Sequence, residues 1–63
     1  MRSSEYVATQ AFGFLCRHGL EDEARSLWQE LGWLDVPAFV AECRVLMLTR
    51  LALPPEAVAA FDR

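Results

Sequence analysis

Side chains with the reactivity that catalysis or metal binding needs are scarce in this sequence. It contains one histidine, His18, and two cysteines, Cys16 and Cys43. Three such residues are fewer than the four ligands of a structural zinc site, and they lack its paired spacing. No serine or cysteine stands in a nucleophile motif, and the three glycines form no phosphate-binding loop. The sequence therefore predicts no catalytic residue, no metal site and no cofactor, in a protein that is not an enzyme.

The same three residues have simpler structural interpretations. Free cysteine is among the most buried residue types, so Cys16 and Cys43 are expected to be small apolar core residues. A disulfide between them would require an oxidising compartment, for which the sequence carries no signal. His18 directly precedes Gly19 at a predicted helix end, where an imidazolium interacts favourably with the last carbonyl groups.

The charge distribution argues against a nucleic-acid partner. Nine acidic residues outnumber six arginines, there is no lysine, and the net charge is −3. Nucleic-acid-binding domains usually carry a basic patch or stripe. Here the arginines are spread along the whole chain, at Arg2, Arg17, Arg25, Arg44, Arg50 and Arg63.

Neither a targeting segment nor a membrane span is expected. The first residues lack a charged region followed by an apolar one. The most apolar run, from Val45 to Leu48, is interrupted by Thr49 and Arg50. It is far shorter than the roughly 20 residues that cross a bilayer. We therefore expect no membrane contact and a cytoplasmic location.

Turn-forming residues divide the chain into four predicted helices. The first runs from Ser4, its expected N-cap, to about His18, and Gly19 supplies the left-handed residue that ends it. The second runs from about Glu21 to Leu31, and the acidic residues that open it match the helix dipole.

The third and fourth helices follow from aspartate and proline. Asp35 is the expected N-cap of a helix that reaches about Leu51, with Pro37 tolerated in its first turn. Pro55 opens a last short helix. This helix either folds back through Val58 and Phe61 or frays, because isolated helices this short are marginal. No segment shows the period of two that is typical of a strand. The sequence predicts a single all-α domain over residues 1–63, a helical hairpin followed by a long third helix and a short C-terminal one.

Apolar residues are more abundant than a chain of this size can bury. Hydrophobic residues make up 54% of the sequence, whereas a domain of about 60 residues buries only about 60% of its unfolded surface. The predicted third helix is apolar on two nearly opposite faces. One face carries Val36, Phe39, Val40, Cys43, Leu46, Met47 and Leu51. The other carries Ala38, Ala41, Val45, Leu48 and Ala52.

The surplus face predicts binding to another protein chain, in a hetero-complex or a homo-oligomer. The candidate contact residues are Ala41, Val45, Leu48 and Ala52, with Trp33 at the rim. Trp28 lies on the apolar stripe of the second helix and is expected in the core. Trp33 follows Gly32 in a turn, where it either covers the core or anchors a partner, because tryptophan is enriched in interface hot spots.

The segment from Ala8 to Leu31 resembles a tetratricopeptide-type helical hairpin. Its turn, HGLEDEA at residues 18–24, is similar to the family's Gly-x-x-x-x-Ala pattern, and Trp28 follows Ala24 by four residues. Leu15 matches the large apolar position before the turn. Two positions of the first helix depart from the family pattern. Phe12 stands where the family prefers a small residue, and Ala8 stands where the family has a large aromatic. Val36 occupies the position of the family's terminal proline. Because a solenoid needs about three repeats, a single unit implies a partner or self-association.

The order of segments also resembles the small tetratricopeptide-like chaperones of bacterial type III secretion. The match consists of a helical hairpin, then WLDVP at residues 33–37, then an apolar helix containing Glu42-Cys43-Arg44. This resemblance implies a chaperone-like or adaptor subunit that binds a partner helix. The alternative function is a small homodimeric regulator, either a DNA-binding helix-turn-helix protein or an antitoxin-like one. A regulator of that kind would need arginine grouped on a recognition helix, whereas the second helix opens with three acids.

Overall fold

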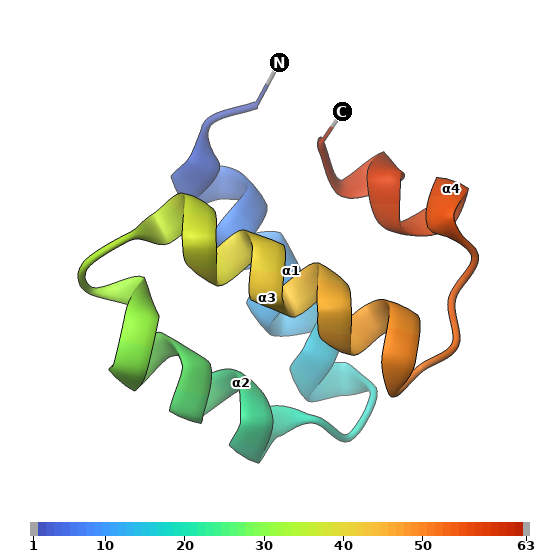
Figure 1. The fold of residues 1–63 in the computed structure, drawn as a ribbon, viewed down its shortest axis with the longest axis horizontal. Coiled ribbons are helices and arrows are strands. Elements are labelled where there is room, and N and C mark those ends of the chain that lie inside the picture. The colour runs from blue at the N-terminus through green and yellow to red at the C-terminus, as the bar shows by residue number, and fades with distance from the viewer. Residues whose placement is uncertain (1, 63) are drawn as a thin grey trace.

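The chain forms four α-helices in a computed structural model, which describes residues 2–62 (Figure 1). They are α1 (Ser4–Arg17), α2 (Glu21–Leu27), α3 (Val36–Thr49) and α4 (Pro55–Ala59). A π-helical turn, η1 (Trp28–Gly32), continues α2, and a 3₁₀ turn, η2 (Ala60–Asp62), continues α4. No strand occurs within the described range, so the predicted all-α class is confirmed.

Local signals set most of the helix boundaries. The Ser3 hydroxyl caps α1 by accepting a hydrogen bond from the Tyr6 N–H at 3.1 Å. The expected cap, Ser4, is wrong by one residue, because Ser3 has the extended backbone of a cap and Ser4 already belongs to the helix. The Asp35 carboxylate caps α3 as predicted, by accepting from the Ala38 N–H at 3.0 Å. Gly19 has a φ of 84°, the left-handed conformation expected at the end of α1.

The second helix departs from the regular helix that the sequence predicts. The α-helical part ends at Leu27, and the backbone widens into the π-helical turn η1. Gly32 closes this turn against the indole ring of Trp28, and a β-carbon at Gly32 would overlap that ring. The missing side chain of Gly32 thus provides the space that the Trp28 indole fills.

The core lies between α1 and α3, which pack against each other more extensively than any other pair of elements. Figure 1 shows α2 and α4 on either side of this central pair. The most buried large side chains are Leu15, Phe39, Cys43 and Met47. The Phe39 ring packs edge-on against the Trp28 indole, with 5.2 Å between centroids.

The C-terminal segment folds back on the core, which is one of the two alternatives that the sequence leaves open. Val58 is buried, and the Phe61 ring meets the Phe14 ring edge-on, with 5.1 Å between centroids. Within this short segment, η2 packs against α1 through Phe61, and α4 packs against α3.

Candidate functional site

The second apolar face of α3 is exposed to solvent. Val45 is 46% exposed and Leu48 is 41% exposed. Ala41, one helical turn before Val45, is exposed as well, and Ala38 is half-buried. On the opposite face of α3, Phe39, Cys43 and Met47 are fully buried and Val40 is nearly so. The exposed stripe therefore carries the two large hydrophobic side chains of α3 that remain in solvent, Val45 and Leu48.

Ala52, the last of the predicted contact residues, does not continue this stripe. The helix ends at Thr49, and Ala52 adopts a left-handed backbone with a φ of 52° in the turn toward α4. The Leu53 N–H donates to the Met47 carbonyl at 3.1 Å across this turn. Ala52 is exposed, but it lies beyond the helical surface formed by Ala41, Val45 and Leu48.

The turn before α3 carries the most exposed apolar side chains of the described residues. Trp33 is 74% exposed and Leu34 is 86% exposed. The Trp33 indole reaches the Trp28 ring, with 6.2 Å between centroids, but does not cover the core. Sequence reasoning missed Leu34. The signal was its place just before the Asp35 cap, where an apolar residue often packs on the first helical turn, and here it stays in solvent.

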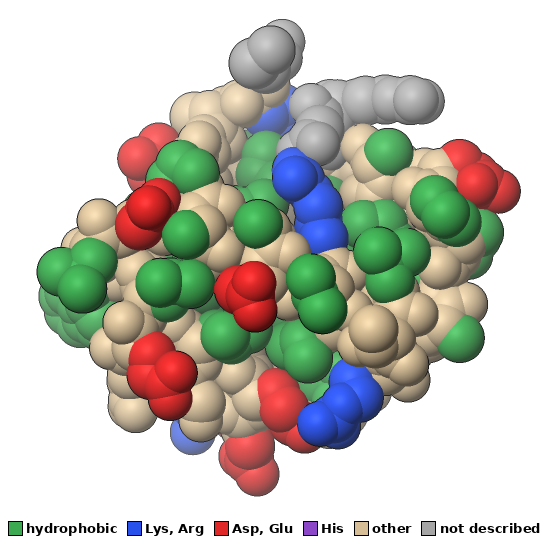
Figure 2. Space-filling view, in the orientation of Figure 1, with side chains coloured by type: hydrophobic (Ala, Val, Ile, Leu, Met, Phe, Trp, Pro, Cys, Tyr) green, Lys and Arg blue, Asp and Glu red, His purple; other side chains and the backbone are tan. Residues whose placement is uncertain are grey.

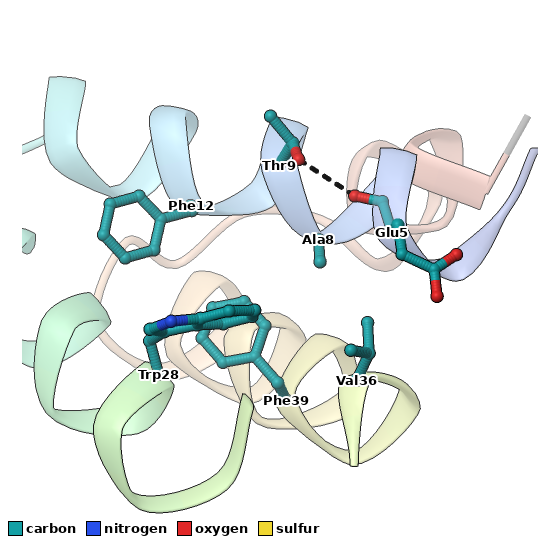
Figure 3. A pocket seen from close by; sticks show the side chains of 7 residues that line it. All are labelled: Glu5, Ala8, Thr9, Phe12, Trp28, Val36 and Phe39. Carbon is teal, nitrogen blue, oxygen red and sulfur yellow. Dashed lines mark hydrogen bonds between the residues drawn. The ribbon is translucent and has the colours of Figure 1, made fainter. Parts of the chain in front are cut away.

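One hollow on the surface is an aromatic cleft between α1 and the start of α3 (Figure 3). It has a volume of about 340 Å³ and is lined by Glu5, Ala8, Thr9, Phe12, Trp28, Val36 and Phe39. Figure 3 shows Phe12 on one wall facing Trp28 and Phe39 on the other. The Thr9 hydroxyl already donates to the Glu5 carbonyl at 2.9 Å. The cleft therefore offers apolar contact and one carboxylate, but few polar groups to orient a ligand.

A second hollow, the α2–α3 groove, combines aliphatic side chains with carboxylates. It has a volume of about 340 Å³ and is lined by Asp22, Glu23, Ser26, Leu27, Glu30, Glu42, Val45 and Leu46. Figure 2 shows this side of the molecule, with acidic side chains over α2 and hydrophobic ones over α3. Val45 belongs both to this groove and to the exposed stripe, so the two surfaces are continuous.

Internal ion pairs leave most of the groove's carboxylates without a basic partner. Arg50 pairs with Glu23 at 3.5 Å, and Arg25 pairs with Glu21 within α2. Between residues 2 and 62, no basic side chain forms an ion pair with Asp22, Glu30 or Glu42. The groove is therefore a locally negative surface over an aliphatic floor.

The two cysteines and the single histidine have different surroundings in the fold. Both cysteines are free thiols, with Cys43 buried and Cys16 half-buried. Burial raises the pKa of the Cys43 thiol to about 12, and the neighbouring Glu42 carboxylate adds to the shift. A thiol that stays protonated is a poor nucleophile. The His18 ring packs against the Phe14 ring, with 4.2 Å between ring centroids. The backbone N–H of His18 caps the end of α1 by donating to the Phe14 and Leu15 carbonyls.

Within the part of the chain that the structure describes, no group of three or more His, Cys, Asp or Glu side chains is arranged to hold a metal ion. Among these residues, no helix combines the length and the apolar character needed to cross a bilayer.

Comparisons with protein-family models, with curated proteins and with solved structures gave no match to this chain. The function is therefore inferred from the chain's own residues and their geometry.

Proposed function

We propose that this protein is a protein–protein interaction module, a chaperone-like or adaptor subunit that binds a partner helix. The observation that carries the proposal is the exposed stripe of α3, where Val45 and Leu48 remain in solvent while Phe39, Cys43 and Met47 on the other face are fully buried. Exposed apolar surface of this kind is typical of an interaction site. A helix laid across it would contact Ala41, Val45 and Leu48 at successive turns.

Trp33 and Leu34 add to this proposal from the turn that precedes α3. An exposed tryptophan beside an exposed leucine costs solvation free energy that a partner would recover. Large aromatic side chains dominate the energy of many interfaces. Trp33 therefore joins Ala41, Val45 and Leu48 as a proposed contact residue, and Leu34 extends the set.

The finer proposal is a tetratricopeptide-like subunit. It is supported by the left-handed Gly19 in the hairpin turn and by the complete burial of Leu15 and Ala24, two positions on which the resemblance depends. A role as a bacterial type III secretion chaperone rests on the order of segments between Trp33 and Arg44. Genes for secretion components beside this protein's gene would support that role.

Site-specific photo-crosslinking in the source cells tests the proposal. A photoreactive phenylalanine analogue placed at Leu48 or Trp33 is expected to give a covalent adduct with a second protein. The same analogue at the exposed Gln10, on the polar face of α1, is the control and is expected to give none. Mass spectrometry of the adduct distinguishes a foreign chain from a second copy of this one.

The result that would overturn the proposal is a lack of position-specific adducts. If Leu48, Trp33 and Gln10 all yield only uncrosslinked chain in cells that produce the protein, the exposed stripe of α3 has no protein partner there.

A further inference from the structure

We infer that the α2–α3 groove selects a basic amphipathic helix of another protein, whose arginine or lysine side chains pair with the carboxylates on both walls. This inference rests on the proposed function, because Val45 belongs to both the groove and the exposed stripe. It specifies the chemistry of the partner. The floor of Leu27, Val45 and Leu46 would contact the apolar side of the partner helix. The carboxylates of the walls would pair with its basic side chains.

The carboxylates occupy opposite walls of the groove. Asp22 and Glu30 stand two helical turns apart on α2 and η1, and Glu42 stands on α3. No basic residue is among the eight that line the groove. A helix with an apolar stripe flanked by cations on both sides would fit this surface, because each flank would face at least one carboxylate.

The molecule itself contains one example of this pairing. Arg50, from the C-terminal end of α3, places its guanidinium nitrogen 3.5 Å from the Glu23 carboxylate. Both side chains are partly exposed, so the contact forms at the rim of the groove. An arginine from a partner would bind Asp22, Glu30 or Glu42 by the same interaction.

A second copy of this chain lacks the charge pattern that the groove requires. Six arginines and no lysine are spread over 63 residues, and the net charge is −3. Each long helix, α1 and α3, contains a single arginine, Arg17 and Arg44 respectively. Neither helix can present cations on both sides of an apolar stripe. The negative walls would therefore repel a second copy, which favours a foreign and basic partner.

Titration of the full ¹⁵N-labelled protein with synthetic helical peptides tests the inference. One peptide of about 15 residues, long enough to form a helix, carries a leucine stripe flanked by arginines. Its analogue has the same stripe flanked by glutamates. We expect the arginine peptide to shift the amide signals of Ser26, Glu42 and Val45. We also expect its dissociation constant to rise severalfold when salt increases from about 0.03 M to about 0.3 M.

Two variants of equal charge separate the groove from general electrostatics. Glu30→Gln with Glu42→Gln removes two carboxylates from the groove, and Glu5→Gln with Glu56→Gln removes two elsewhere. All four side chains are exposed, so both variants are expected to fold. Loss of two exposed ion pairs should weaken binding of the arginine peptide about three- to tenfold. The Glu5/Glu56 variant should bind like the unmodified protein.

Four results would overturn the charge-selective groove. Equal binding of both peptides through Val45 and Leu48 would leave the proposed function standing with a charge-neutral partner. Equal weakening by both variants would show that the attraction is not located in the groove. Absence of binding by either peptide, together with a crosslinked adduct at Leu48, would show that the partner has a different chemistry. Absence of both binding and adducts would remove the proposed function as well.

Discussion

Cys43 is the residue, among those that the structure describes, whose titration the fold changes strongly. Its thiol is fully buried among the core side chains of α3, and burial raises its pKa from 9.0 to about 12. The nearby Glu42 carboxylate is the smaller cause of the same rise. The native state therefore keeps the proton at pH values where the unfolded chain loses it.

This difference predicts a loss of stability at alkaline pH. Below pH 9 the contribution of the protonated thiol is fully present, and it declines as the pH rises from 9 toward 12. In that pH window the native state binds up to one proton more than the unfolded chain. The free energy of unfolding therefore falls by up to about 1.4 kcal/mol per pH unit. Urea unfolding at several pH values from about 8 to 10.5 measures the slope. The Cys43→Ala variant should lose the part of this slope that comes from the thiol. A slope that is the same in the variant would show that Cys43 does not cause the pH dependence.

Ala52 is the only residue other than glycine, among those described, with a positive φ. The left-handed conformation costs an L-residue about 1–2 kcal/mol, whereas glycine increases the entropy of the unfolded chain by about 0.4–1 kcal/mol. Because the side chain is exposed, we expect Ala52→Gly to stabilise the fold by about 0.5–1 kcal/mol. Thermal and urea unfolding would measure the change.

Gly19 provides the reverse test. Its φ is 84°, and no atom lies within 4 Å of the position of an added β-carbon. Gly19→Ala should therefore destabilise the protein through the backbone alone, by roughly the amount that Ala52→Gly gains. Stabilisation by Gly19→Ala would mean that the turn does not have the left-handed conformation.

At the scale of elements, the π-helical turn η1 depends on the contact between Gly32 and Trp28. A methyl group at Gly32 would overlap the indole ring, so Gly32→Ala must displace Trp28 from its place against Phe39. We expect a loss of about 1–3 kcal/mol, typical of overpacking, and a changed near-ultraviolet circular dichroism signal from the aromatic rings.

Gly13 offers a matched control within α1. An added β-carbon there would meet only the flexible end of Arg17, at 3.3 Å. Gly13→Ala should therefore gain helix propensity, up to about 1 kcal/mol. Equal losses from both substitutions would contradict a specific role for Gly32.

The helix boundaries could be predicted from local sequence signals. Gly19, Asp35 and Pro55 act on their own neighbours, and each marks the helix boundary that it predicts. The π-helical turn was not predictable in this way, because the apolar spacing of Leu27, Trp28 and Leu31 is the same in an α-helix. Within this turn the Trp28 indole packs on Gly32, and the apolar spacing does not encode that contact.

The candidate site was predictable only in part, for a related reason. The periodicity of α3 predicts two apolar faces, and the structure leaves the face with Val45 and Leu48 exposed. The α2–α3 groove requires α2 to lie beside α3, and nothing local in the sequence determines that arrangement. Trp33 was ambiguous because a residue in a turn has no helical face to assign it to.

At the scale of the whole molecule, neighbouring residues of α3 separate stability from binding. A chain of this length has a total stability of roughly 3–9 kcal/mol. Met47 is fully buried, so Met47→Ala should remove about 2–5 kcal/mol. Leu48 is 41% exposed, so Leu48→Ala should change the free energy of unfolding by less than about 1 kcal/mol.

Chemical denaturation of both variants at two protein concentrations checks this contrast. A loss at Leu48 that matches the loss at Met47 and grows with protein concentration would show that copies of the chain bury this face between them. That outcome would replace a foreign partner with self-association.

The two tryptophans give the protein two different optical environments within one short segment. Trp28 is half-buried against Phe39, and Trp33 is 74% exposed. A soluble quencher should therefore reach Trp33 first. Because the two ring centroids are only 6.2 Å apart, excitation energy passes readily between the indoles, and a quencher at Trp33 also dims Trp28. Intrinsic fluorescence will consequently register an event at the surface and an event in the core as one signal, until Trp33→Phe separates them.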